Sequence, residues 1–136
     1  MSTKQNLLVG RTLTGIKIAK DKQAILFQTT DGDIVAACDG DCCSRTWVEH
    51  IELPALGFPA LVTAADDVSM PDLGDMDGCE VVAYYGFKVS TDKGEILIDY
   101  RNDSNGAYGG SLAWPGDYFY GGVHGKNQSE CEWVSP

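Results

Sequence analysis

The sequence predicts one mainly-β domain of the α+β class over residues 1–136, with antiparallel hairpins or a meander, one short helix and a glycine- and aromatic-rich C-terminal tail. Two parts of the chain consist of short strand-like segments, rich in apolar residues, that are separated by short turns. This pattern is typical of antiparallel hairpins. A further segment spaces its apolar residues as a helix does. With 136 residues, 43% of them hydrophobic, the chain has the size of one domain with its own core.

The opening of the chain predicts three consecutive strands. These segments are rich in apolar and β-branched residues and comprise residues 12–19, 23–30 and 34–38. Asp31 and Gly32 separate the second segment from the third, and an Asp-Gly pair favours a tight hairpin turn. We therefore expect a three-stranded antiparallel meander at the start of the domain.

Residues 44–53 form the predicted helix. Ser44 is a preferred N-cap residue, and Trp47, Val48 and Ile51 have the spacing of one helical face. A proline follows directly and ends the helix. Because about two turns are marginal in isolation, we expect packing against the sheet to hold this helix.

A further strand and a second hairpin follow the predicted helix. The strand is expected at residues 59–64, a polar loop at 65–78, and the two arms of the hairpin at 79–90 and 95–101. In both arms the apolar side chains occupy alternate positions, so each arm has one buried face.

The C-terminal tail, residues 102–136, combines glycine with aromatic side chains. Seven of the 16 glycines lie within residues 106–125, interleaved with Trp114 and the run Tyr118–Tyr120. This composition predicts short strands and irregular loops that large buried rings hold in place. For the aromatic residues two alternatives stay open, a cap over the end of the core or a contact surface for self-association or a foreign partner.

The chain is strongly acidic, with a formal net charge of −10 from 10 basic and 20 acidic residues. Residues 1–30 carry five basic residues and one acidic residue, so the excess of acid falls on the rest of the chain. Direct nucleic-acid binding and anionic membranes are disfavoured, because both need clustered basic side chains. An acidic body favours solubility and a basic protein partner.

We expect a cytoplasmic protein. The first nine residues are too few and too polar for the apolar core of a signal peptide, and no apolar run approaches the ~20 residues of a membrane span. The five cysteines are an odd number, which also argues against a disulfide framework. Reduced thiols are therefore expected.

The cysteines leave several alternatives open. Cys42 and Cys43 are adjacent, and Cys38 lies shortly before them. Free cysteine is most often a small buried residue, whereas a cysteine at the start of a helix would be reactive. Adjacent cysteines differ from the C-x2-C spacing of zinc knuckles, and common cofactor motifs are absent, so we predict no metal and no cofactor. An enzyme alternative uses Cys43 or Cys42 as nucleophile with His124 as base.

Two segments carry a resemblance to a known family: GDCCSRTWVE at residues 40–49 and YRNDSNGAYGGS at residues 100–111. With the opening meander, they resemble small uncharacterised proteins that phages, and bacteria carrying phage genes, encode. Those proteins share a DCCS-x-x-W-x-E segment and a late RN-x-SNG-x-Y-GG segment, and the resemblance spans roughly residues 10–113. It implies a cytosolic accessory protein of a phage or prophage that acts by binding a host component, and it supplies no catalytic residue.

The two motif segments also supply the candidate ligand-binding residues. These residues are Asp41, Cys42, Cys43, Trp47, Arg101, Asn102, Ser104, Asn105 and Tyr108. Arginine has a planar fork that suits a carboxylate or phosphate, and the neighbouring glycines allow a ligand to approach the backbone closely. Asparagine and serine in such a segment either contact a ligand or brace the local backbone.

These observations favour a non-enzymatic phage accessory protein that acts by stoichiometric binding in the host cytoplasm. The expected action is inhibition of a host defence or regulatory component, either by covering a basic protein surface or by sequestering a small signalling ligand. One alternative is the cysteine-dependent enzyme. Another is a virion structural or decoration protein. Self-association into a homo-oligomer is compatible with each of them.

Overall fold

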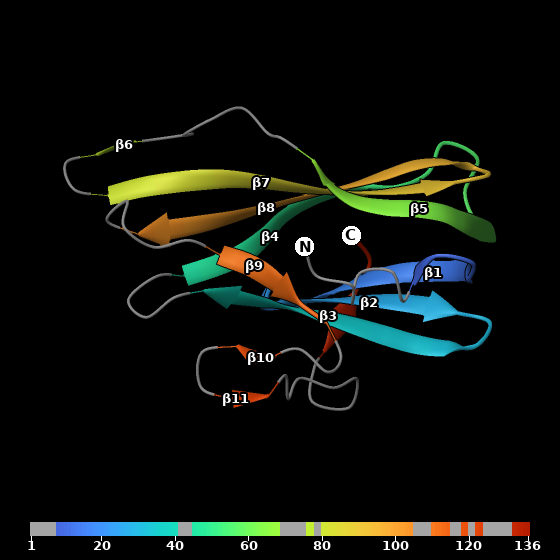
Figure 1. The fold of residues 1–136 in the computed structure, drawn as a ribbon, viewed down its shortest axis with the longest axis horizontal. Helices are drawn as coiled ribbons and strands as arrows, with labels where there is room; N and C mark the ends of the chain where they lie inside the picture. The colour runs from blue at the N-terminus through green and yellow to red at the C-terminus, as the bar shows by residue number, and fades with distance from the viewer. Residues whose placement is uncertain are drawn as a thin grey trace.

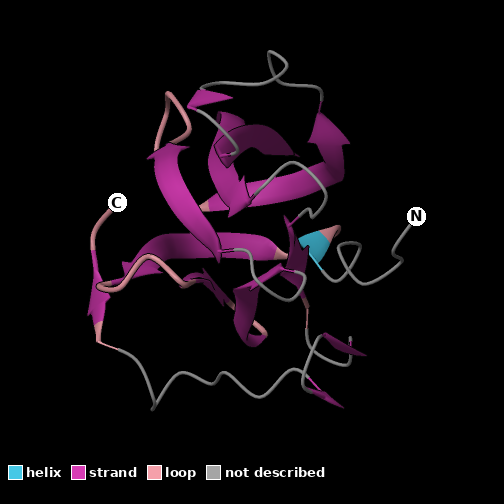
Figure 2. Ribbon diagram, turned by 90° about the vertical axis from the view of Figure 1, so that its left-hand side faces the viewer, coloured by secondary structure: helices cyan, strands magenta, loops and turns pink. Residues whose placement is uncertain are grey.

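The computed structural model describes residues 8–40, 45–68, 76–77, 80–104, 110–114, 118–119, 122–123 and 132–136. Within these ranges the chain is almost entirely β-strand, and Figure 2 shows only one short helical turn, which lies at Leu8. The prediction of a mainly-β fold is therefore confirmed. In the same ranges, no helix has the length and apolar character needed to cross a membrane.

All strand pairs are antiparallel. The strands are β1 (Thr12–Ala19), β2 (Ala24–Thr29), β3 (Gly32–Gly40), β4 (Arg45–Glu52), β5 (Ala60–Val68), β6 (Met76–Asp77), β7 (Glu80–Thr91), β8 (Gly94–Ser104), β9 (Gly110–Ala113), β10 (Tyr118–Phe119), β11 (Gly122–Val123) and β12 (Trp133–Val134). Ten of them form one sheet in the order β4-β8-β7-β5-β1-β2-β3-β9, with β6 added to β7 and β12 added to β1. The remaining two, β10 and β11, pair with each other.

The sheet is folded into two layers (Figure 1). One layer contains β4, β8, β7 and β5, and the other contains β1, β2, β3 and β9. The layers are joined where β5 meets β1, where Thr12 pairs with Leu61 and Leu13 with Ala60. Strand β4 also lies against β3, so the two ends of the sheet approach each other.

The two predicted hairpins are confirmed, and they share one turn design. β2 and β3 are joined at Thr29 and Gly32, and β7 and β8 are joined at Thr91 and Gly94. In each turn the threonine hydroxyl donates to the glycine carbonyl and accepts the amide N–H two residues further along. Both glycines have positive φ angles, 117° and 123°, which side-chain-bearing residues adopt only with strain.

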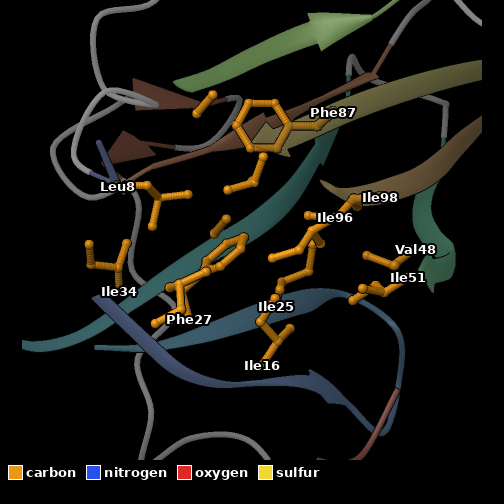
Figure 3. Packing of buried hydrophobic residues seen from close by; sticks show 14 of the residues in the cluster. Leu8, Ile16, Ile25, Phe27, Ile34, Val48, Ile51, Phe87, Ile96 and Ile98 are labelled. Carbon is orange, nitrogen blue, oxygen red and sulfur yellow. The ribbon is translucent and has the colours of Figure 1, made fainter. Parts of the chain in front are cut away.

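The main core lies between the two layers, and Figure 3 shows its side chains pointing inward from both. It holds Phe27 from one layer, Phe87 from the other, and Trp114 immediately after β9. The Trp114 ring lies 5.6 Å from the Phe27 ring and 5.3 Å from the Phe87 ring, measured between ring centroids. Trp114 therefore belongs to the core, which favours the cap alternative for this member of the aromatic tail.

A second buried cluster covers the other face of the β1-β2-β3 layer. It consists of Ala19, Ala24, Leu26 and Val35, with Trp133 of β12 packed against it. Because both faces of β2 are covered, Ile25, Leu26 and Phe27 are all buried in succession. This explains why residues 23–30 read as a continuous apolar segment rather than an alternating one.

The helix predicted for residues 44–53 is wrong, because the described part of this segment is strand β4. Its register with β8 shifts between Val48 and His50, which is the signature of a β-bulge. The extra residue moves the inward position from His50 to Ile51, so Val48 and Ile51 are both buried. A three-residue spacing in a bulged strand is the same spacing that a helical face has, and this caused the error.

Strand β5 starts one residue after its predicted position and continues four residues beyond it, to Val68. The predicted polar loop at 65–78 is therefore partly strand, since it also contains β6. The inward faces of the second hairpin are as predicted: Phe87, Ile96, Ile98 and Tyr100 are buried. Cys38, at the end of the meander, is half-buried and packs against the core.

Candidate functional site

Polar and aromatic side chains gather on the outer face of β4, β8 and β7. Arg101 of β8 lies between Trp47 on β4 and Tyr84 on β7, because these three residues are paired across the sheet. Side chains of one strand alternate between faces, so Asp99 shares this outer face with Arg101. We call Trp47, Glu49, Tyr84, Asp99 and Arg101 the outer-face cluster.

The Trp47 indole is fixed by a carboxylate. Its Nε1–H donates a hydrogen bond of 3.0 Å to Oε1 of Glu49. The same oxygen lies 3.8 Å from Nη1 of Arg101. The hydrogen bond from Trp47, together with the nearby charges of Arg101 and Lys22, lowers the pKa of Glu49 below its ordinary value. Glu49 therefore stays ionised at neutral pH.

Arg101 is the centre of the cluster. Its Nη2 donates to Oδ2 of Asp99 at 3.3 Å, and its guanidinium carbon lies 4.2 Å from the centre of the Tyr84 ring. Two carboxylates and one aromatic face thus engage the guanidinium group. The sequence predicted that the Arg101 guanidinium binds an external anion, but it is turned toward Asp99 and Glu49. Arg101 therefore serves to position Glu49 and, through it, Trp47.

A surface pocket with a volume of about 200 Å³ adjoins Trp47. Its lining residues are Asp21, Lys22, Gln23 and Trp47, so the turn between β1 and β2 forms the opposite wall. Lys22 has a positive φ angle of 63°, and its carbonyl accepts the Val48 amide N–H at 2.9 Å. This backbone hydrogen bond ties the turn to β4 and holds the two walls of the pocket together.

The Asp21 carboxylate shapes the turn from within. Its Oδ1 accepts the backbone N–H of Gln23 at 3.0 Å, which is the geometry of an Asx turn. The Gln23 carbonyl in turn accepts the Cys38 amide N–H at 2.8 Å, and the Cys38 thiol lies 3.7 Å from the Lys22 carbonyl. The pocket wall is therefore anchored to β3 as well as to β4.

Asn102 lies on the opposite face of β8 from Arg101. It is fully buried, and its Nδ2 donates a hydrogen bond of 2.9 Å to the Thr46 hydroxyl, which is also buried. This pair joins β4 to β8 inside the core. Arg101 and Asn102 are neighbours in sequence but cannot line one pocket, because the sheet lies between their side chains.

The structure brings together only part of the predicted binding set. Trp47 and Arg101 meet in the outer-face cluster, Asn102 is in the core, and Ser104 is the last residue of β8, paired with Val81. The other candidates lie outside the described residues: Asp41, Cys42, Cys43, Asn105 and Tyr108, together with His124 of the enzyme alternative. Among the residues that are described, no group of three histidine, cysteine or acidic side chains is placed to hold a metal ion.

Sequence reasoning missed the partners that make Trp47 a site. Asp21 and Lys22 fall in the gap between two predicted strands, and Gln23 is the first residue of the second of these strands. Tyr84 and Asp99 are only members of a predicted hairpin. The alternation of Asp99 and Arg101 on one face of β8 was a usable signal. No comparable signal in the sequence indicates that the β1-β2 turn approaches Trp47, because this approach depends on how the two layers fold over each other.

These features define an antiparallel β protein with a surface pocket beside a tryptophan. The chain belongs to a family described as a domain of unknown function (DUF7448), whose model matches residues 6–114. The matched range includes the outer-face cluster, the pocket and Trp114. Comparison with curated proteins and with solved structures found no match.

Proposed function

We propose that this protein is a non-enzymatic binding protein that acts stoichiometrically, with the surface around Trp47 as its contact site. The observation that carries the proposal is that Trp47 walls an open pocket while Glu49 and Arg101 fix its ring. Tryptophan is enriched among the residues that dominate protein interfaces, because it offers a large contact area at a small cost in conformational entropy.

The size of the pocket favours a protein partner over a small signalling molecule. Sites for drug-sized ligands and cofactors measure about 300–1,000 Å³. The pocket beside Trp47 measures about 200 Å³, which suits a single side chain of a partner. The net charge of −10 supports the same choice, since it attracts basic protein surfaces and repels nucleic acid.

The biological setting of the proposal comes from the sequence. The DCCS-x-x-W-x-E and RN-x-SNG-x-Y-GG segments resemble those of phage-encoded accessory proteins. Trp47 and Arg101 each belong to one of these segments, and they are paired across β4 and β8. We therefore propose a phage or prophage protein that acts in the host cytoplasm by occluding a surface of a defence or regulatory protein.

The proposal is tested by affinity capture from a bacterial host with the tagged wild-type chain and two variants. Trp47→Ala removes the proposed contact. Leu56→Ala is the matched control, because Leu56 is a large exposed apolar residue beside the β7-β8 turn, where its N–H donates to the Lys93 carbonyl at 3.0 Å. Wild type and Leu56→Ala should retain the same protein in a fixed ratio, and Trp47→Ala should lose it. Retention of that protein by Trp47→Ala would place the contact elsewhere. Chemical modification of the captured protein by trace amounts of the wild-type chain would favour the alternative of a cysteine-dependent enzyme.

A further inference from the structure

The walls of the pocket indicate which kind of side chain it receives. One wall is the Trp47 indole, whose face attracts cations through its negative electrostatic potential. The facing turn brings Asp21 and Gln23 to the pocket, and their side chains carry a carboxylate and an amide. An aromatic face, a carboxylate and an amide oxygen are all groups that favour a cation with several N–H donors.

Glu49 adds a second carboxylate at the edge of the indole. One of its oxygens accepts the Trp47 Nε1–H at 3.0 Å, so the carboxylate and the ring keep a fixed relative position. Glu49 is also partly exposed, with 38% of its side-chain surface accessible. A positive group lying on the Trp47 ring would therefore have Asp21 in the pocket wall and the Glu49 carboxylate at the N–H edge of the ring.

Lys22 is the one lining residue of this pocket whose charge disfavours a cation. It is exposed and lies near enough to Glu49 to lower the pKa of that carboxyl. Part of its charge is thus offset within the site. Lys22 provides a test of which charge the pocket prefers in a ligand. Removing the charge of Lys22 must strengthen the binding of a cation and weaken the binding of an anion.

We propose that the pocket beside Trp47 receives a basic side chain of a protein partner, with the arginine guanidinium as the best fit. The planar guanidinium stacks on an aromatic ring while its edges donate to carboxylates. Arg101 on Tyr84 already shows this packing within the same surface, at 4.2 Å from the ring centre. This inference rests on the proposed function and specifies what the Trp47 surface recognises.

The test uses a single amino acid as the probe. Nα-acetyl-arginine methylamide is titrated into the ¹⁵N-labelled wild-type protein at about physiological ionic strength, where long-range attraction to the acidic chain is screened. The indole Nε1–H signal of Trp47 is followed, and that of Trp114, which is buried in the core between the two layers, is the internal control. The matched neutral probe is the citrulline derivative, which has the same shape without the charge, and the acidic probe is the glutamate derivative.

We expect a saturable shift of the Trp47 signal with the arginine probe and a steady Trp114 signal. The citrulline probe should bind at least about fivefold more weakly, in line with the strength of a cation–π contact supported by carboxylates. Asp21→Asn and Glu49→Gln, which keep the acceptor oxygens of the turn and of the Trp47 hydrogen bond, should each weaken arginine binding about two- to fivefold. Lys22→Gln should strengthen it.

Three results would overturn the inference: equal binding of the arginine and citrulline probes, tighter binding of the glutamate probe together with a loss in Lys22→Gln, or no shift with any probe. None of them decides the proposed function, which depends on whether Trp47→Ala loses the captured protein. If that loss occurs while Asp21→Asn and Glu49→Gln bind the captured protein with the affinity of the wild type, Trp47 is the contact and the basic side chain is not its target. If Trp47→Ala retains the protein, the contact site itself is wrong.

Discussion

Trp47 donates its indole N–H to Glu49, and through this hydrogen bond of 3.0 Å the ring is held beside the pocket rather than free to rotate. A ring ordered before binding loses less conformational entropy when a partner packs on it. Arg101 keeps Glu49 in place from the neighbouring strand, at 3.8 Å. Three residues on two strands thus prepare one aromatic contact on the outer face.

The first prediction concerns Trp47 itself. Trp47→Ala should weaken binding of the captured partner at least about tenfold, since interface tryptophans commonly contribute about 2 kcal/mol or more. Trp47→Phe should retain part of the affinity, because it keeps an aromatic wall but loses the N–H that Glu49 accepts. Affinities measured by calorimetry, with urea unfolding curves to show that both variants stay folded, check this. Equal affinities for wild type and Trp47→Ala would contradict it.

The second prediction separates Asn102 from the binding surface. Asn102→Ala should lower the free energy of unfolding by about 1–3 kcal/mol, because it removes a buried amide that donates to Thr46. Partner affinity should stay within about twofold of wild type, since Asn102 lies on the inner face. The double variant Asn102→Ala/Thr46→Ala should cost less than the sum of the two single changes. Purely additive costs would show that the two side chains do not depend on each other.

The third prediction compares the two hairpin glycines, which have the same turn hydrogen bonds and nearly the same φ angle. A Cβ at Gly32 would meet nothing within 4 Å, whereas one at Gly94 would lie 2.9 Å from the Ala55 backbone nitrogen. Gly32→Ala should therefore cost only the conformational strain, about 1 kcal/mol, and Gly94→Ala clearly more, about 2–3 kcal/mol. Urea unfolding of both variants measures the difference, and equal costs would contradict the close contact at Gly94.

The fourth prediction concerns alkaline pH. Burial, followed by the charge of Asp67 and the proximity of Tyr85, raises the pKa of Tyr100 well above its ordinary value of about 10. The unfolded chain ionises this group from about pH 10 while the folded chain keeps it neutral. Its contribution to stability is thus complete below pH 10 and is lost as the pH rises further. The free energy of unfolding should fall less steeply above pH 10 in Tyr100→Phe than in wild type, and parallel curves would contradict this assignment.

The meander and the second hairpin could be predicted because their turns and their alternation are local properties. Asp31-Gly32 and the segment 91–94 each carry the glycine that a tight turn with positive φ requires. Strand β4 could not be predicted, because a bulge after Val48 gave its apolar residues a three-residue spacing. Only the pairing with β8, which is distant in sequence, distinguishes that bulged strand from a helix.

The candidate site was predictable only in part for a related reason. Trp47 and Arg101 were identified from their motif segments, and the register of β4 with β8 brings them together. Asn102 belongs to the same motif as Arg101, but the alternation of side chains along a strand sends it into the core. The pocket wall at Asp21–Gln23 depends on the folding of one layer over the other, which no local pattern encodes.

The most direct test of the account is a titration of the captured partner with the purified protein, followed by calorimetry and by the partner's own activity. The account predicts saturation at a fixed molar ratio, an inhibition that tracks occupancy, and a loss of at least about tenfold in affinity for Trp47→Ala but not for Leu56→Ala. Inactivation of the partner by substoichiometric amounts of the protein, or an unchanged affinity of Trp47→Ala, would contradict it.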